Sequence, residues 1–521
     1  MAIVRFLACI ICWLGSAGTI TTEKPPHIIF ILADDLGWDD VSFHGSDQIP
    51  TPNIDDLAYN GVILHNYYVQ PLCTPTRSAL LTGKYPIHTG LQHFVITPDE
   101  PVGLPLNEST LANYLKKLGY ATHLVGKWHL GYFAKEYTPT YRGFDSHYGF
   151  YLGHQDYYTH FTHWQNYWGF DLRHDMDVQR SVFGDYSTEL FTTHAENIIR
   201  KHDPDKPLFL YFAHQAVHFS NNNQLEAPYR YTSRFPYILD ERRKTYAGMV
   251  SALDESVGNV TRVLKESGLY NNSVIIFSTD NGGPSEKCES FNTPLRGTKS
   301  TLWEGGVRGD AFIHSKFLEK PKRLCSGMMH ITDWLPTLYH IAGGNVSDLH
   351  HLDGFNMWDT ISRDIPSPRT EILHNIDPIY ANAALRVGDY KVIIGEKTSD
   401  WFVPPGITKE QKNTTIFNNI SSDPRADVIH CGPVPSEAHT NCQTTKPCLY
   451  NIKDDPCEYY NLADKYPDIL QMLLNKLDMY NSTALKPWVE PADPRADPKL
   501  HNYTWMPWVE LTDVKTETQY H

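Results

Sequence analysis

HIIFILADD, residues 27–35, is a continuous apolar run that ends in two aspartates. A short apolar run of this kind is typical of a strand that is buried on both faces of a sheet. Three more segments have the same character: YATHLVGKWH (120–129), PLFLYFAHQAVH (207–218) and SVIIFSTDNGG (273–283). Each of them also ends in charged or polar residues.

Helical patterns lie between these predicted strands. STLANYLKKLGY (109–120) has Ser109 as the expected N-cap and Gly119 at its C-terminal end. RRKTYAGMVSALDESVGNVTRVLKESG (242–268) has apolar residues at helical spacing. Buried strands alternating with helices predict an α/β fold, in which a large and mainly parallel sheet is sandwiched by helices.

The pattern changes after about residue 375. AALRVGDYKVIIG (383–395) alternates around a Gly-Asp turn like an antiparallel hairpin, 398–440 is polar like a long loop, and DILQMLLNKLDMYNS (468–482) is an amphipathic helix. We therefore expect a catalytic N-terminal domain over residues 19–375. Residues 376–521 would form a smaller C-terminal α+β domain built on an antiparallel sheet.

The first residues, MAIVRFLACIICWLGSAGT, have a basic start, a short apolar run and small residues, which is typical of a cleaved secretory signal over residues 1–18. No later segment has the length and apolarity of a membrane span. Eight N-x-S/T sequons agree with the secretory pathway, and the destination is secreted or lysosomal. A net charge of -15 argues against nucleic acid as a partner.

Of nine cysteines, Cys9 and Cys12 would leave with the signal. In an oxidising compartment we expect three disulfides among the six C-terminal cysteines: Cys288, Cys325, Cys431, Cys442, Cys448 and Cys457. The spacing of Cys448 and Cys457 suits a bridge across a hairpin, and the other pairs stay open. Cys73 is then left over.

Polar residues at the strand ends form a candidate site, because ligands of such sheets bind beyond the carboxyl ends of the strands. Asp34, Asp35, Asp280 and Asn281 offer oxygen ligands of the kind that Ca²⁺ or Mg²⁺ prefers. The candidate cations for an anionic substrate are Arg77, Lys127, His129, His218 and Lys299. For His214 we expect a structural role.

Cys73 lies in PLCTPTRSALLTG, residues 71–83, at an expected helix N-terminus. The helix dipole there would stabilise a thiolate, so a cysteine hydrolase with His129 or His218 as base is one hypothesis. A thiolate is a soft ligand, however, and fits poorly beside hard oxygen ligands of a metal.

The segment around Cys73 resembles the sulfatase signature Cys-x-Pro-Ser/Thr-Arg, and GYATHLVGKWH (119–129) resembles the second signature of that family. TPNIDDLAYNG, TDNGG and LRGTKSTLWEGGVR are also similar to sulfatase segments. The likeness covers nearly the whole mature chain and is closest to the arylsulfatase B-like (N-acetylgalactosamine-4-sulfatase-like) branch. One departure is Tyr137, where that branch often has a cysteine.

The resemblance implies the alkaline-phosphatase-like sulfatase fold and a particular site. A formylglycine-generating enzyme would convert Cys73 to Cα-formylglycine, and one Ca²⁺ would be bound by Asp34, Asp35, Cys73, Asp280 and Asn281. Arg77 and Lys127 would orient the formylglycine, and Lys127 would also contact the substrate. His129 would contact the hydrated formylglycine, and His218 and Lys299 would face the sulfate and the leaving oxygen.

The implied activity is hydrolysis of sulfate esters, either small aryl sulfates or sulfated sugars such as N-acetylgalactosamine 4-sulfate. Two alternatives stay open: a formylglycine-dependent phosphonate or phosphodiester hydrolase of the same fold, and a non-catalytic binder of sulfated glycans. The segment 151–170, rich in Tyr, His and Trp, would form either an aromatic sugar-binding wall or a packed loop. The oligomeric state is left open.

Overall fold

The computed structural model describes residues 24–46, 48–396, 399–405 and 423–511. The predicted signal over 1–18 lies outside these residues, as do Asn413 and Asn419 of the predicted sequons.

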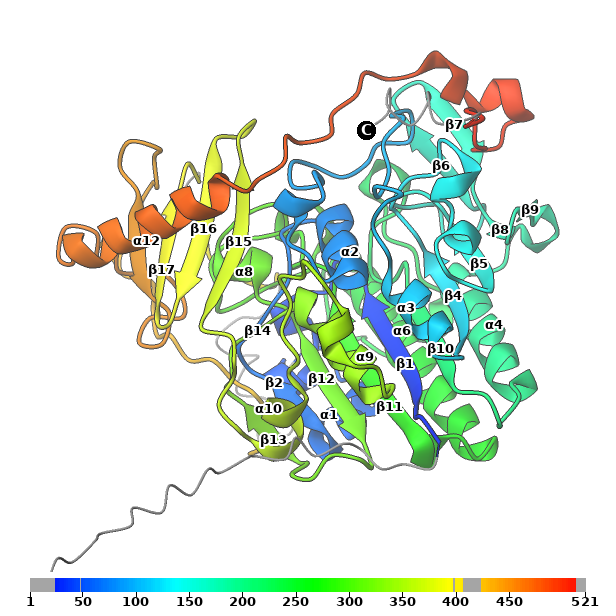
Figure 1. Ribbon diagram of the computed structural model, residues 1–521, viewed down its shortest axis with the longest axis horizontal. Coiled ribbons are helices and arrows are strands. Elements are labelled where there is room, and N and C mark those ends of the chain that lie inside the picture. The colour runs from blue at the N-terminus through cyan, green and yellow to red at the C-terminus, as the bar shows by residue number, and fades with distance from the viewer. Residues whose placement is uncertain (1–23, 47, 397–398, 406–422, 512–521) are drawn as a thin grey trace, which may run out of the picture.

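A ten-stranded sheet with the order β13-β2-β12-β11-β1-β10-β4-β5-β8-β9 forms the larger part of the molecule (Figure 1). The predicted strands are its centre, where β11, β1, β10, β4 and β5 run parallel. Their bounds are β1 (His27–Ala33), β4 (Ala121–Lys127), β5 (Ser146–Phe150), β10 (Leu208–Ala213) and β11 (Ser273–Thr279). The outer strands are β2 (Val62–Leu64), β8 (Arg173–His174), β9 (Asp177–Val178), β12 (Ala311–Ser315) and β13 (Arg323–Cys325).

Helices cover both faces of this sheet because alternate residues of β1 point to opposite sides. Ile28, Phe30 and Leu32 pack in one core, and Ile29 and Ile31 pack in the other. The first core includes α2 (Cys73–Thr82), α3 (Leu111–Lys117), α9 (Trp334–Ile341) and α10 (Trp358–Arg363). The second includes α1 (Pro52–Asn60), α4 (Ser187–Lys201) and α6 (Glu241–Glu266). The α/β class is confirmed.

The two predicted helices are present, with one change at a cap. Thr110, not Ser109, is the N-cap of α3, because its side chain accepts from the backbone N–H of Asn113 while the Asn113 side chain bonds back to Thr110. This reciprocal pair requires the Asn side chain three residues after the cap, which places the cap at Thr110.

A four-stranded antiparallel sheet forms the smaller part of the fold, in the order β15-β16-β17-β18. Its strands are β15 (Glu371–Asp377), β16 (Asn382–Val387), β17 (Tyr390–Ile394) and β18 (Cys448–Asn451), and α12 (Pro467–Asn481) packs on it. The hairpin and the amphipathic helix are as predicted. The predicted division between residues 375 and 376 falls within β15, and the domain bounds stay a prediction.

The disulfides differ from the expected pattern. Cys431 pairs with Cys457 and Cys442 with Cys448, so the predicted bridge between Cys448 and Cys457 is wrong. Cys448 starts β18, and the adjacent 442–448 loop turns back onto it, whereas Cys457 lies beyond the strand. Cys288 and Cys325 are buried free thiols, like Cys73.

The segment after α12 returns to the large sheet (Figure 1). We call residues 484–509 the strap. Trp488 donates its backbone N–H to Gly90 O, and Trp505 donates to Phe170 O in β7 (Tyr167–Phe170). The strap therefore spans from the small sheet to the hairpin of β6 (Phe161–Trp164) and β7.

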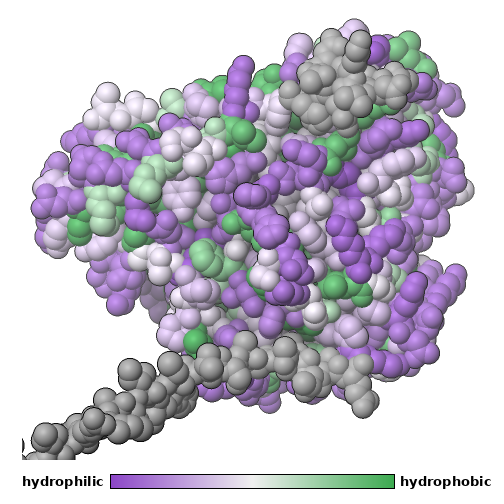
Figure 2. All heavy atoms as spheres, in the orientation of Figure 1, coloured by the Kyte–Doolittle hydropathy of each residue, from purple (hydrophilic) through white to green (hydrophobic). Residues whose placement is uncertain are grey.

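The face drawn in Figure 2 is mainly hydrophilic, with apolar residues scattered among polar ones. Within the described ranges, the structure contains no helix with both the length and the apolarity needed to cross a bilayer.

Candidate active site

Neighbouring parallel strands bring the predicted site residues together. Asp34 and Asp35 follow β1, Asp280 and Asn281 follow β11, Lys127 ends β4, and His218 comes shortly after β10. Because β11, β1, β10 and β4 are adjacent and parallel, these residues meet at one edge of the sheet.

Each of three carboxylates has a cationic partner. The Nζ of Lys127 lies 2.5 Å from Asp34 Oδ2, and that of Lys299 lies 2.5 Å from Asp35 Oδ1. Arg77 donates from Nε and Nη2 to Asp280 Oδ2, at 3.2 and 2.9 Å.

The charges at this edge are balanced, so a divalent cation would make the pocket positive and suited to an anionic ester. Burial raises the pKa of Asp34 to about 7, and the charge of Asp280 adds to the effect. Burial would also raise the pKa of Asp35, but the ammonium group of Lys299 holds it well below its usual value.

Cys73 is the first residue of α2 and lies inside this cluster. Its Sγ is 3.4 Å from the Nζ of Lys299 and 3.9 Å from Asp34 Oδ1, and the residue is 2% exposed. Burial raises the pKa of the thiol to about 11, although Lys127 and Lys299 partly oppose this. The thiol is therefore protonated near neutral pH, which disfavours the thiolate hypothesis.

His129 follows β4 with a left-handed backbone conformation, at a φ of 58°. Its Nε2 lies 3.1 Å from the carbonyl oxygen of Ile96. Since a carbonyl can only accept, Nε2 carries the proton and Nδ1 keeps a lone pair. Nδ1 is buried and bonds to no group in the described part of the chain, so it can accept a proton.

His218 has the opposite arrangement. Its Nδ1 lies 2.7 Å from Phe219 O and therefore donates, which leaves the lone pair on Nε2. Nε2 lies 3.4 Å from Asp35 Oδ2, and burial keeps the pKa of His218 well below its usual value. A neutral nitrogen and a carboxylate that face each other favour a cation between them.

The residues fit a hard metal ion. Ligand atoms of Asp34, Asp35, Cys73 and His218 all lie within 4.8 Å of one another. Asp35 Oδ2 and Asn281 Oδ1 are buried oxygens that accept no hydrogen bond from the described residues. Buried orphan oxygens are costly unless a cation or a donor satisfies them. Asp280 faces the same cluster, since its Oδ1 accepts from Asp35 N–H at 3.3 Å.

Supporting residues were missed by the sequence analysis. Ser290 Oγ lies 2.9 Å from both the carbonyl oxygen of Asp35 and Asp40 Oδ2 and can donate to either, and Asp40 pairs with Arg243 at 2.7 Å. Tyr157 donates to the carbonyl of His218 at 2.9 Å. These residues come from distant segments, and no local pattern marks them.

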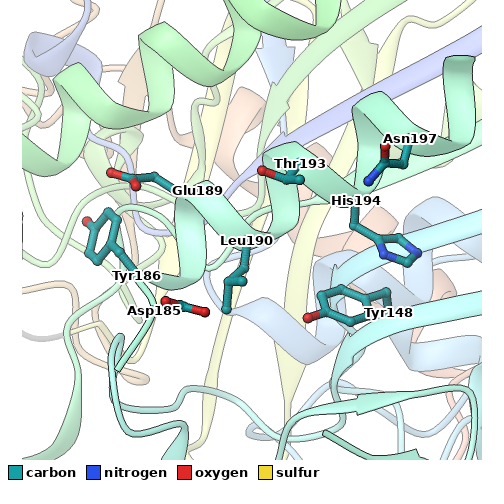
Figure 3. A pocket seen from close by; sticks show the side chains of 8 residues that line it. All are labelled: Tyr148, Asp185, Tyr186, Glu189, Leu190, Thr193, His194 and Asn197. Atoms are coloured by element: carbon teal, nitrogen blue, oxygen red, sulfur yellow. The ribbon is translucent and has the colours of Figure 1, made fainter. Parts of the chain in front are cut away.

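Two features lie apart from this cluster. His214 is buried with its Nε2 3.2 Å from Ser256 Oγ, which agrees with the expected structural role. A cavity of about 310 Å³ lies beside α4 and is lined by residues such as Tyr148, Glu189 and His194 (Figure 3). None of the residues drawn there is a predicted site residue.

The chain is also similar to known proteins. A sulfatase family model matches residues 26–344. The chain is 44% identical to arylsulfatase J of Mus musculus, over 96% of this chain and 83% of the relative. It is 30% identical to arylsulfatase A of Homo sapiens, over 88% of each. The crystal structure of Ps i-CgsB in complex with k-i-k-neocarrahexaose has a TM-score of 0.74 and 28% identity, covering 95% of this chain and 99% of that one.

Proposed function

The chain belongs to the sulfatase family and is a sulfuric ester hydrolase, and we propose that it cleaves sulfate esters of sugars through a formylglycine formed from Cys73, with one Ca²⁺. The arylsulfatase B-like branch, N-acetylgalactosamine 4-sulfate as a substrate, and a secreted or lysosomal location remain parts of this proposal.

The placement of Cys73 is the observation that carries the proposal. A buried thiol with a pKa of about 11 is a poor nucleophile, yet it lies among three carboxylates and three cations. A hydrated aldehyde at the same position would offer hydroxyl groups, which are hard ligands and suit Ca²⁺ better than a thiol does. The sequence around it, Cys-Thr-Pro-Thr-Arg, matches the motif that the modifying enzyme reads.

Asp34, Asp35, Asp280, Asn281 and residue 73 would hold the calcium ion, which when bound would polarise a sulfate oxygen and lower the pKa of a hydroxyl at residue 73. The orphan oxygens Asp35 Oδ2 and Asn281 Oδ1 support this assignment.

Four side chains of the site have separate roles in the proposed reaction. Arg77 donates to Asp280 and to the carbonyl of Lys127, so it fixes the ends of β11 and β4 relative to each other. His129 can take a proton at Nδ1 from a hydroxyl at residue 73. Lys299 lies next to residue 73, and its ammonium group can only donate, so it is placed to bind sulfate and to protonate the leaving oxygen. His218 would need a second proton to act as that acid.

A sugar substrate is supported by the likeness to Ps i-CgsB, a protein whose structure contains k-i-k-neocarrahexaose. Arylsulfatase relatives equally support turnover of small aryl sulfates.

Mass spectrometry of the peptide that contains Cys73 tests the proposal. We expect a loss of roughly 18 mass units in active protein, since the thiol and one hydrogen are replaced by a carbonyl oxygen. Cys288 and Cys325 are buried free thiols in the same chain and should keep their mass. Sulfatase activity from protein with an intact Cys73 thiol would overturn the mechanism.

A further inference from the structure

The segment that follows β5 lies between the two histidines of the candidate active site. Gly153 packs on His129, because a Cβ at residue 153 would lie 2.7 Å from His129 Cε1. The ring of His154 lies parallel to that of His218, with an interplanar angle of 8° and 5.6 Å between ring centroids. Two consecutive residues therefore contact the two catalytic candidates that follow β4 and β10.

The backbone of this segment is held from several sides. Asp171 Oδ2 accepts from the N–H groups of Tyr151 and Leu152, at 3.1 and 2.9 Å. Thr162 donates to the carbonyl of His154 at 2.7 Å, and Gln215 donates to the carbonyl of the next residue, Gln155. Hydrogen bonds therefore fix the backbone on both sides of His154.

His154 lies on the outer side of the charged pocket. His129 and His218 are 4% and 5% exposed, whereas His154 is only half-buried. Burial, together with the positive charges of Lys127 and Lys299, lowers the pKa of His154 to about 4, so its ring is neutral near neutral pH. His154 is thus the more exposed of two stacked rings at the site, which favours a contact with the part of a substrate that lies beyond the sulfate.

Asn221 completes a polar pair at this position. Its side chain interacts with His154. Its amide also donates to Phe161 O at 2.9 Å and accepts from His163 N–H at 2.8 Å, which ties both residues to the β6–β7 hairpin. An imidazole and an amide supply both donors and acceptors, as adjacent sugar hydroxyl groups require.

We propose that His154 contacts the leaving group and selects sugars that carry a hydroxyl beside the scissile sulfate ester. The inference rests on the proposed function and names the part of the substrate that the site recognises. An aryl leaving group lacks that hydroxyl, so it would gain nothing from His154. A site built to bond a hydroxyl discriminates against substrates that lack it.

The test compares two substrate classes on the same His154 variants. For His154→Ala, kcat/KM should fall about tenfold or more on N-acetylgalactosamine 4-sulfate or a sulfated chondroitin disaccharide, mainly through KM, because one hydrogen bond to substrate is lost. The kcat/KM for 4-nitrophenyl sulfate should change less than about threefold. His154→Gln, which keeps a donor and an acceptor, should recover part of the loss on the sugars.

His174→Ala is the matched control, because it removes an exposed histidine on β8, the second strand from the edge of the large sheet. Equal losses on both substrates, or no loss on the sugars, would overturn the role of His154. If the wild-type enzyme cleaves the aryl sulfate but none of these sugars, this inference and the sugar substrate both fail, while sulfate ester hydrolysis through a formylglycine at residue 73 stands. If Cys73 is unmodified in active enzyme, the proposed mechanism fails first.

Discussion

Gly153 leaves no room for a side chain beside His129. A Cβ at this residue would lie 2.7 Å from His129 Cε1 and 3.0 Å from Nε2. The ring would have to move, and its bond to the Ile96 carbonyl sets which nitrogen is free to accept a proton. A single methyl group therefore tests whether the position of His129 matters for the reaction.

We expect Gly153→Ala to lower kcat on the order of a hundredfold, since small displacements of a catalytic group are costly. The melting temperature should change far less, because the methyl group meets a ring and not the sheet core. Steady-state kinetics and thermal unfolding measure the two effects.

The double variant Gly153→Ala/His129→Ala separates the causes of this loss. If Gly153→Ala acts through His129, the double variant should be no slower than His129→Ala alone. Additive losses would show that Gly153 acts in some other way.

At the scale of elements, the strap holds a loop that reaches the candidate active site. Trp488 donates its indole N–H to Thr89 O at 2.9 Å, and its ring lies against Gly90. The same loop continues to Ile96, whose carbonyl accepts a hydrogen bond from His129 Nε2 and whose N–H donates to Thr74 Oγ1 at 3.2 Å. The strap thus supports the pocket without contacting its charged residues directly.

We expect Trp488→Ala to loosen residues 88–96 and to lower kcat severalfold. The variant loses one hydrogen bond, worth about 1 kcal/mol, and the packing of the indole ring on Gly90. Amide hydrogen exchange of this loop, measured beside activity, checks both effects. Val489→Ala is the matched control, because Val489 is the next residue and is about half exposed. Unchanged exchange in Trp488→Ala would contradict the role of the strap.

At the scale of the whole molecule, buried neutral histidines make stability depend on pH. Burial lowers the pKa of His147 and His214 to about 3 and that of His27 to about 4. In the unfolded chain their pKa is about 6.5, so below that pH the unfolded state binds more protons than the folded state. The free energy of unfolding therefore falls as pH decreases from about 6.5 to about 3.

We expect His147→Gln to reduce this pH dependence by up to one proton, or about 1.4 kcal/mol per pH unit. His147 is fully buried in β5, with its Nε2 3.1 Å from Gly126 O, so the variant is also less stable at neutral pH. Urea unfolding between pH 4 and 7 measures the slope. His163→Gln, at an exposed position, should keep the wild-type slope. An unchanged slope for His147→Gln would rule out this contribution.

The small sheet is joined to the large one through a buried ion network. Lys391 of β17 lies 2.9 Å from both Glu304 of α8 (Glu304–Val307) and Glu458. Two buried carboxylates share one ammonium group, so their geometry depends on how the small sheet packs against α8. This is an interaction that no single segment of the sequence indicates.

Local patterns were enough to predict β1, β4, β10 and β11, because the strands of a sheet that helices cover on both faces are continuous apolar runs. They also predicted a helix N-terminus at Cys73, where α2 begins, and polar residues after each strand. The cap at Thr110 was missed because Ser109 and Thr110 are both good caps, and the choice depends on the bond to Asn113. The disulfide pairs depend on how distant loops meet, which spacing does not specify.

The sequence by itself determined the sulfatase family, the strand-end residues and the motif at Cys73, since these depend on residues close together in the chain. Only the tertiary structure decided that β11, β1, β10 and β4 are neighbours, which pairs each carboxylate with its cation. It also decided the free nitrogens of His129 and His218 and the contact of His154 with His218. The physical reason is that these contacts depend on strand order and crossing segments, which join residues far apart in sequence.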